Sequence, residues 1–138
     1  MSQTRAFGGA KILLHHQGAL LTYLRDDKAG IPFPAMWDLP GGGREADETP
    51  IHCALRETHE EFALNISPER INWQRAYPNL EHPTLPNWFF AATITHAEID
   101  QIKFGDEGQH WCMMPIETYL SHPNAIPHLQ ARVRDALA

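Results

Sequence analysis

Apolar and polar positions along this chain of 138 residues alternate in short segments that are typical of strands. Residues 6–15 and 19–24 are largely apolar, and the glycine-bearing stretch between them predicts a hairpin connection. Further short strands are expected at residues 37–40, 72–76, 88–95 and 109–114. Proline- and glycine-rich stretches separate these segments, and one of them, the run from Gly41 to Gly43, is expected to be a flexible turn.

One segment has the period of an amphipathic helix. Thr49 suits the N-cap and Pro50 the first helical position, so we expect a helix that begins here and ends near residue 63 or 64. On a wheel of about 100° per residue, one stripe should face the core. Its members are Ile51, Leu55, Thr58 and Phe62. Closing helices are expected at residues 115–120 and 127–137, and the whole pattern predicts a mixed sheet covered by helices on its faces.

Composition narrows the class of protein. The length suits one domain over residues 1–138, no apolar run approaches a membrane span, and residues 1–10 lack the pattern of a signal peptide. A net charge of −6 argues against binding duplex nucleic acid. The two cysteines, Cys53 and Cys112, are expected to be buried thiols in a protein of the reducing cytosol. We therefore expect a cytoplasmic protein without membrane contact, monomeric or homodimeric, and its charge does not exclude a phosphorylated small molecule as partner.

The predicted central helix carries an unfavourable group of charges. Glu57, Glu60 and Glu61 lie on one side of it, away from the core stripe and in its last two turns. Like charges at these spacings, at the negative end of the helix dipole, destabilise a helix. A solvated acidic face is one interpretation. The alternative is that a cation compensates the charge, and hard carboxylate oxygens favour Mg²⁺ or Mn²⁺.

The residues around these acids follow a known spacing. Gly42 is followed after five residues by Glu48, and after seven more by Arg56-Glu57-Thr58-His59-Glu60-Glu61-Phe62-Ala63-Leu64. This string resembles the Nudix box, the signature of hydrolases that cleave nucleoside diphosphates linked to another moiety. The resemblance implies an α/β fold in which an α/β/α sandwich surrounds a mixed β-sheet, and it implies a pyrophosphohydrolase that uses a divalent metal.

Two positions depart from the signature. Thr58 replaces an aliphatic residue, but its methyl can pack in the core while its hydroxyl bonds back to the helix. Ala63 replaces a glycine. Either Ala63 adopts a left-handed conformation at a cost of about 1 kcal/mol, or the helix continues and Asn65 forms the left-handed cap. Neither departure removes a metal ligand, so both bear on the end of the helix only.

The resemblance also implies roles for single residues. Glu57, Glu60 and Glu61 would be metal ligands, with the backbone carbonyl of Gly41 a further one. Arg56 would orient the carboxylates, so that the catalytic group includes Arg56, Glu57 and Glu60. Glu48 would support them or reach a metal-bound water.

The proton acceptor has no uniform place in this family, and one loop offers a candidate. Glu107 lies between two glycines in the stretch 104–108. A solvated turn acid is the simpler interpretation. We favour Glu107 as an additional metal ligand or as the catalytic base, with its neighbour Asp106 the weaker candidate.

Two further residues are candidates for substrate binding. Arg25 ends the second predicted strand, where relatives carry basic residues, and either contacts a phosphate or is an ordinary surface charge. Trp88 either packs in the core or stacks on a base, because nucleotide pockets combine aromatic walls with few polar anchors.

The expected reaction is Mg²⁺-dependent hydrolysis of a phosphoanhydride in a nucleoside di- or triphosphate, including non-standard or oxidised nucleotides, or in a nucleoside diphosphate linked to another moiety. A pyrophosphatase of ADP-ribose, nucleotide sugars or dinucleoside polyphosphates is an alternative substrate assignment. A non-catalytic nucleotide sensor of the same fold is an alternative of another class, although sensors would be expected to lose the box acids that this chain retains.

Overall fold

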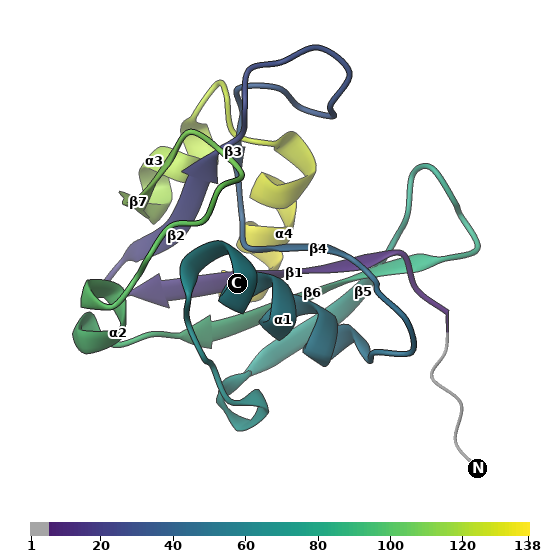
Figure 1. The fold of residues 1–138 in the computed structure, drawn as a ribbon, viewed down its shortest axis with the longest axis horizontal. Coiled ribbons are helices and arrows are strands. Elements are labelled where there is room, and N and C mark those ends of the chain that lie inside the picture. Colours follow the sequence, from purple (N-terminus) through teal and green to yellow (C-terminus); the bar gives the residue numbers. More distant parts are fainter. Residues whose placement is uncertain (1–5) are drawn as a thin grey trace.

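The computed structural model describes residues 6–138. Residues 1–5, part of the segment 1–10 for which no signal peptide is predicted, lie outside the described residues. A seven-stranded mixed sheet forms the centre, with strand order β3-β2-β1-β6-β5, while β4 pairs with β1 and β7 with β2 (Figure 1). The strands are β1 Gly9–His16, β2 Ala19–Leu24, β3 Trp37–Asp38, β4 Gly41–Gly43, β5 Trp73–Pro78, β6 Pro86–Thr93 and β7 His110–Pro115. The helices are α1 Pro50–Phe62, α2 His96–Asp100, α3 Ile116–Ser121 and α4 Pro127–Leu137, with a 3₁₀ turn at Pro68–Arg70.

The register of β1 explains how the sheet is assembled. β1 runs parallel to β6 over seven residue pairs from Gly9–Asn87 to His15–Thr93, and antiparallel to β2 and β4. A parallel pair requires a long crossover, and the segment containing α1 and β5 supplies it. The predicted mixed sheet with helices on its faces is therefore confirmed.

The glycine run is a correction to the sequence prediction. Gly41 to Gly43 do not form a free turn but a strand, β4, whose three residues pair with Lys11, Ala10 and Gly9 of β1. A Cβ on Gly41 would lie 2.1 Å from the Ala10 carbonyl oxygen, so a side chain has no room there. Glycine is required at Gly41 by close packing of two backbones, and this fixes the carbonyls that face α1.

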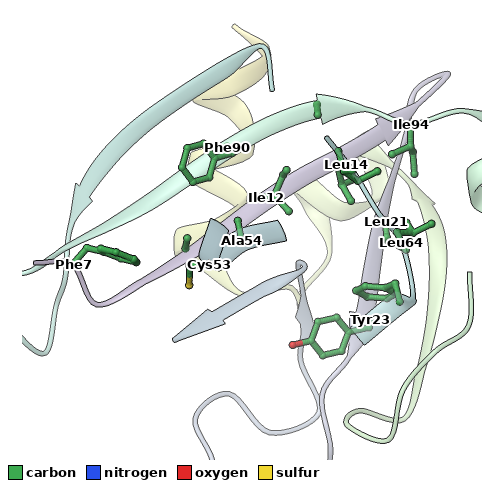
Figure 2. Close-up of a cluster of buried hydrophobic side chains, with 14 residues drawn as sticks. Phe7, Ile12, Leu14, Leu21, Tyr23, Cys53, Ala54, Leu64, Phe90 and Ile94 are labelled. Atoms are coloured by element: carbon green, nitrogen blue, oxygen red, sulfur yellow. The ribbon is translucent and has the colours of Figure 1, made fainter. Parts of the chain in front are cut away.

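Each face of the sheet buries its own core. Alternate residues of β1 and β6 point to opposite faces, so that Ile12, Leu14 and Phe90 lie in one core (Figure 2). Phe62 of α1 belongs to the same core. Leu13 and Phe89 belong to the second core, which includes Leu129 and Val133 of α4. The expected sandwich of helix, sheet and helix layers is thus present.

The ends of α1 follow the sequence closely. The Thr49 side chain accepts a hydrogen bond from the His52 N–H, and Pro50 occupies the first turn. Ala63 has φ 58° and ψ 28°, which decides for the left-handed alanine and against a cap at Asn65. Thr58 is fully buried and donates to the Ala54 carbonyl at 2.8 Å, as expected for a threonine on the core stripe.

Two short elements, the 3₁₀ turn Pro68–Arg70 and helix α2, were missed at the sequence level. Helix α2 begins with a capping box, in which Thr95 and Glu98 satisfy each other's backbone N–H groups. Cys53 is buried and Cys112 is half-buried, and both are free thiols. Within residues 6–138, no helix combines the length and the apolar character that crossing a membrane requires.

Candidate metal and substrate site

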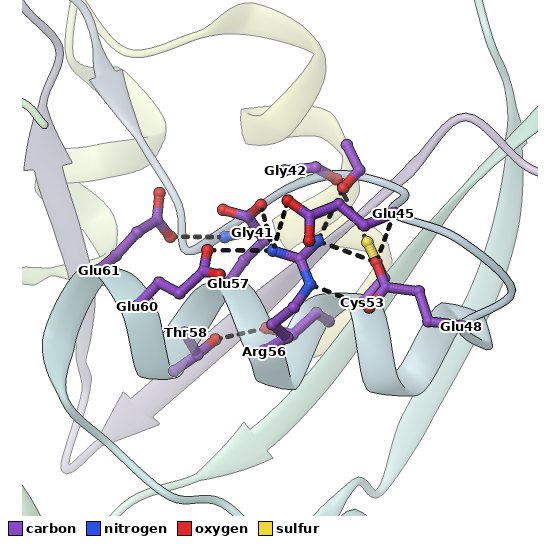
Figure 3. A network of polar contacts seen from close by, with 12 residues as sticks. Gly41, Gly42, Glu45, Glu48, Cys53, Arg56, Glu57, Thr58, Glu60 and Glu61 are labelled. Atoms are coloured by element: carbon purple, nitrogen blue, oxygen red, sulfur yellow. Dashed lines mark hydrogen bonds and ion pairs between the residues drawn. The ribbon is translucent and has the colours of Figure 1, made fainter.

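Arg56 organises the acidic cluster on α1 (Figure 3). Its Nε and Nη2 donate to the two carboxylate oxygens of Glu48 at 2.9 and 2.8 Å. Its Nη1 lies 3.0 Å from both a Glu57 and a Glu60 carboxylate oxygen. The Nη2 also donates to the Gly43 carbonyl at 3.0 Å. One guanidinium thus ties Glu48, Glu57 and Glu60 to the β4 strand, while the orienting role of Arg56 in a reaction stays a prediction.

The hydrogen bonds to Arg56 hold Glu48 in its charged form. They are the main cause that lowers the pKa of Glu48 from its ordinary 4.5 to about 2. The Glu45 N–H donates to the same carboxylate at 2.7 Å. Glu48 therefore acts as the support of Arg56, while Glu57 and Glu60 share the remaining nitrogen.

Glu57 lies directly against the glycine strand. A Cβ on Gly42 would lie 2.7 to 2.9 Å from the three atoms of the Glu57 carboxyl group. Burial raises the pKa of Glu57, and the charge of Glu60 adds to that effect, although Arg56 opposes it. The absence of a side chain on Gly42 is what allows the carboxylate to approach the backbone.

Glu61 is the most enclosed of the three acids. Its carboxylate accepts a hydrogen bond from the Gly41 N–H at 3.0 Å. Burial raises the pKa of Glu61 to about 8, against the opposing effect of Lys11 and of the Gly41 bond, and Glu57 and Asp38 raise it further. Crowded carboxylates whose charged forms are disfavoured gain stability from a nearby cation.

Lys11 is a site residue that the sequence reasoning missed. Its ammonium donates to the Gly41 carbonyl, the Leu39 carbonyl and the Asp38 carboxylate, each at 3.1 Å. Asp38 is 1% exposed, and its carboxylate also forms an ion pair with Arg25, whose Nη1 lies 3.0 Å away. The available signal was a lysine inside the apolar segment of β1, because a charge at such a position needs a buried partner.

The donor set fits a hard divalent cation. Carboxylate and carbonyl oxygens are the preferred ligands of Mg²⁺ and Mn²⁺. In the part of the chain that the structure describes, no three acidic, histidine or cysteine side chains already form a metal cage. Here Arg56 supplies the positive charge to Glu57 and Glu60, and the Gly41 N–H binds Glu61. A bound cation would take Glu57, Glu60, Glu61 and the second lone pair of the Gly41 carbonyl as its ligands.

The loop that contains Glu107 docks on the end of α1. The Gly105 N–H donates to the Glu61 carbonyl at 2.9 Å, and a Cβ on Gly105 would lie 3.0 Å from the Glu60 carbonyl. Glu107 itself is exposed and shares a cavity of about 210 Å³ with Arg25. The structure therefore brings these two predicted residues together, but the role of Glu107 stays a prediction.

Arg25 is largely engaged within the protein. Its Nη1 binds Asp38 at 3.0 Å and its Nε donates to the Pro32 carbonyl at 2.9 Å. The expected phosphate contact stays a prediction for this side chain, which has a structural role in addition.

Trp88 lies on the α1 face of the sheet, stacked on Phe90 with ring centroids 6.1 Å apart and planes at 10°. It also lines a second cavity of about 450 Å³, which Gly42, Gly43 and Lys11 border. The indole is thus partly core and partly cavity wall, and stacking on a base stays a prediction.

Comparison with known proteins places this geometry in a family. The family model described as NUDIX domain matches residues 4–135. An m7GpppN-mRNA hydrolase NUDT17 of Danio rerio is 34% identical over 84 residues, which cover 56% of this chain and 28% of that protein. An RNA pyrophosphohydrolase of Xylella fastidiosa is 30% identical over 95 residues, which cover 54% of this chain and 48% of that protein.

The fold agrees with solved structures as well. The MutT protein from Methanosarcina mazei Go1 superposes with a TM-score of 0.73 at 19% identity, covering 97% of this chain and 95% of that chain. This chain spans less than half the length of either sequence relative above. The match over residues 4–135, together with the box acids and their arrangement around Arg56, shows that the chain belongs to the Nudix family.

Proposed function

We propose that this chain hydrolyses a phosphoanhydride bond in a nucleotide-like substrate, with Mg²⁺ or Mn²⁺ as its cofactor. The observation that carries the proposal is the position of Glu57 and Glu61 against the Gly41–Gly43 strand, with Glu60 joined to that strand through Arg56. A helix stabilised for its own sake would not collect three acids at its negative end. A cation-dependent reaction gives that arrangement a use.

The chain's own residues would divide the work. Arg56 and Glu48 would position the carboxylates, and Gly41 and Gly42 would let the cation approach the backbone. Glu57 or Glu60 would accept the proton of the attacking water, or Glu107 would do so from its loop. A bound divalent ion supplies neutralisation of the phosphates and a lower pKa for the attacking water.

The substrate assignment rests on the cavity and on relatives. The larger cavity, about 450 Å³, has the size of nucleotide pockets. The two sequence relatives are named as an m7GpppN-mRNA hydrolase and an RNA pyrophosphohydrolase, so nucleoside di- and triphosphates are the first substrates to test. ADP-ribose, nucleotide sugars and dinucleoside polyphosphates form the alternative group. A nucleotide sensor is less favoured because all four box acids are retained.

A phosphate-release screen over nucleotides, nucleotide sugars and dinucleoside polyphosphates tests this proposal, with Mg²⁺ and with EDTA. Glu60→Gln should lower the maximal rate at least about 100-fold, because it removes a charged ligand. Glu117→Gln is the matched control, an exposed acid on α3. Equal turnover by the wild type and Glu60→Gln, or no turnover of any substrate, would contradict the proposal.

Arg25 and Trp88 need separate variants. Arg25→Gln and Trp88→Leu should raise KM more than they change kcat if these residues bind substrate. An unchanged KM would leave Arg25 as the partner of Asp38 and Trp88 as the partner of Phe90. We also propose a reducing cytosol as the setting, and a monomer or homodimer as the state of the chain.

A further inference from the structure

The larger cavity has a positively charged end that the proposed metal site does not use. Residues of the start of β1, of the loop joining β5 to β6 and of helix α4 line this cavity. Figure 1 shows where these elements lie in the fold. Lys11, Gly42 and Gly43 line it from β1 and β4, while His128 and Arg132 line it from α4. Lys11 is already paired with Asp38. Arg132, in contrast, has no acidic partner within residues 6–138.

Arg132 is buried without a polar partner. It is 8% exposed, and its guanidinium carbon lies 4.5 Å from the centre of the Tyr77 ring. Within residues 6–138 it makes no side-chain hydrogen bond and no ion pair, although its nitrogens are not sealed from solvent. Stacking on Tyr77 holds the guanidinium in place but leaves its donors unused.

The nearest acid on the same helix is engaged elsewhere. Asp135 accepts a hydrogen bond from the Tyr77 hydroxyl at 2.7 Å and lies 3.3 Å from Arg75. Among the described residues, Glu81 is the only acid that lines the cavity, and it is exposed in the loop between β5 and β6. No carboxylate of the described chain therefore neutralises Arg132.

The residues beside Arg132 add no negative charge. Burial lowers the pKa of His128 and the charge of Arg132 lowers it further, against the opposing effect of Asp38, so the surroundings favour the neutral imidazole. Phe33 packs on His128 with ring centroids 5.5 Å apart. Burial also lowers the pKa of Arg132, yet a guanidinium does not lose its proton in proteins. A buried positive charge without a partner is costly, and an anionic ligand removes that cost.

We propose that this end of the cavity binds a phosphate group of the substrate that is separate from the cleaved bond, with Arg132 as its main ligand. The planar fork of a guanidinium matches two oxygens of a phosphate. The inference rests on the proposed function for its substrate class, since it names a nucleotide that carries an additional phosphate. That phosphate is either on the ribose of the nucleoside or on the second moiety of the substrate.

Binding measured by calorimetry in EDTA tests the inference without any hydrolysis. Adenosine 5′-monophosphate is compared with adenosine 2′,5′- and 3′,5′-bisphosphate, and ADP-ribose with ADP-ribose 5″-phosphate. We expect one of the additional phosphates to tighten binding about tenfold, the effect of one good charged contact. The pair that shows the gain identifies whether the ribose or the second moiety carries the phosphate.

The variants separate Arg132 from charge in general. Arg132→Gln should remove the tenfold gain and leave the affinity for the ligand without the additional phosphate within about twofold. Arg134→Gln, which removes an exposed arginine of the same helix, should keep the gain. Arg132→Lys, which keeps the charge without the fork, should retain part of it.

Three results would overturn the inference. The first is that no additional phosphate tightens binding to the wild type, a result that does not depend on any variant folding. The second is that the gain persists in Arg132→Gln. The third is that guanosine 5′-monophosphate binds more tightly than adenosine 5′-monophosphate, while neither adenosine bisphosphate binds more tightly than the monophosphate. That result would assign Arg132 to the edge of a base. A protein without hydrolase activity can still give the expected binding, so the two proposals fail separately.

Discussion

Glu57 lies so close to Gly42 that a Cβ on the glycine would fall 2.7 Å from the Glu57 carboxyl carbon. The obstructing atoms are the end of a flexible side chain, so an added methyl would move the carboxylate and not the fold. The neighbouring Gly43 faces open space, with nothing within 4 Å of the same added atom. Two adjacent glycines therefore form a matched pair for testing the site.

Gly42→Ala should lower the maximal rate at least about tenfold, because it displaces a proposed metal ligand from its place. Gly43→Ala should retain a rate close to that of the wild type. Both variants should unfold in urea near the wild-type midpoint. Equal rates for the two variants would show that the approach of Glu57 to Gly42 has no part in the reaction.

Asp38 joins Lys11 and Arg25 in the interior, and its removal should destabilise the chain. Burial disfavours the charged form of Asp38, but Lys11 and Arg25 outweigh it and hold its pKa below the ordinary range. Asp38→Asn leaves both cations without a buried anion, so we expect a loss of about 3–5 kcal/mol. Urea unfolding measures the loss, with the exposed Asp27→Asn as control. If Asp38→Asn lost no more free energy of unfolding than Asp27→Asn, the stabilising role of the contacts among Asp38, Lys11 and Arg25 would be contradicted.

The pair between Glu48 and Arg56 predicts a pH dependence of stability. The folded pKa of Glu48, about 2, lies below its ordinary 4.5. The stabilisation is therefore fully present above about pH 4.5 and is lost as the pH falls toward 2. Free energies of unfolding of the wild type and Glu48→Gln, measured in EDTA, should differ at pH 7 and converge near pH 2. The more exposed Glu45→Gln should show a smaller difference at every pH.

Ala63 predicts a stabilising substitution. Its left-handed conformation, with φ 58°, costs an alanine about 1 kcal/mol and a glycine little. Ala63→Gly should therefore raise the free energy of unfolding by about 0.5–1 kcal/mol. Ala131→Gly, at an exposed position in the middle of α4, should lower it by a similar amount because glycine disfavours a helix interior. A destabilised Ala63→Gly would mean that strain at this position is relieved in another way.

Glu107 is tested against its own neighbour. If Glu107 is a ligand or the base, Glu107→Gln should lower kcat about 100-fold or more, while Asp106→Asn leaves it nearly unchanged. Both residues are exposed in the loop held by the bond from Gly105 to Glu61, so general effects on that loop should be equal. If kcat of Glu107→Gln equals that of Asp106→Asn, Glu107 is an ordinary acid of a solvated turn.

Local signals in the sequence were sufficient for much of the molecule. The cap formed by Thr49 and Pro50 placed the start of α1, and the spacing of the box acids identified the family. Helix α4 begins and ends at the residues expected for it. These features depend on neighbours within a few residues, and such neighbours can be read along the chain.

Other features depend on partners far away in the chain. The glycine run became strand β4 only because β1 lies beside it, and Lys11 reaches Gly41 across 30 positions of sequence. Arg132 gives no sign in the sequence that it lacks an acid, because Asp135 is nearby on the same helix but binds Tyr77 and Arg75. The sequence alone determined which groups could carry charge at the site and in what order. Only the tertiary structure decided which charges are neutralised, because pairing is a matter of distance between side chains brought together by the sheet.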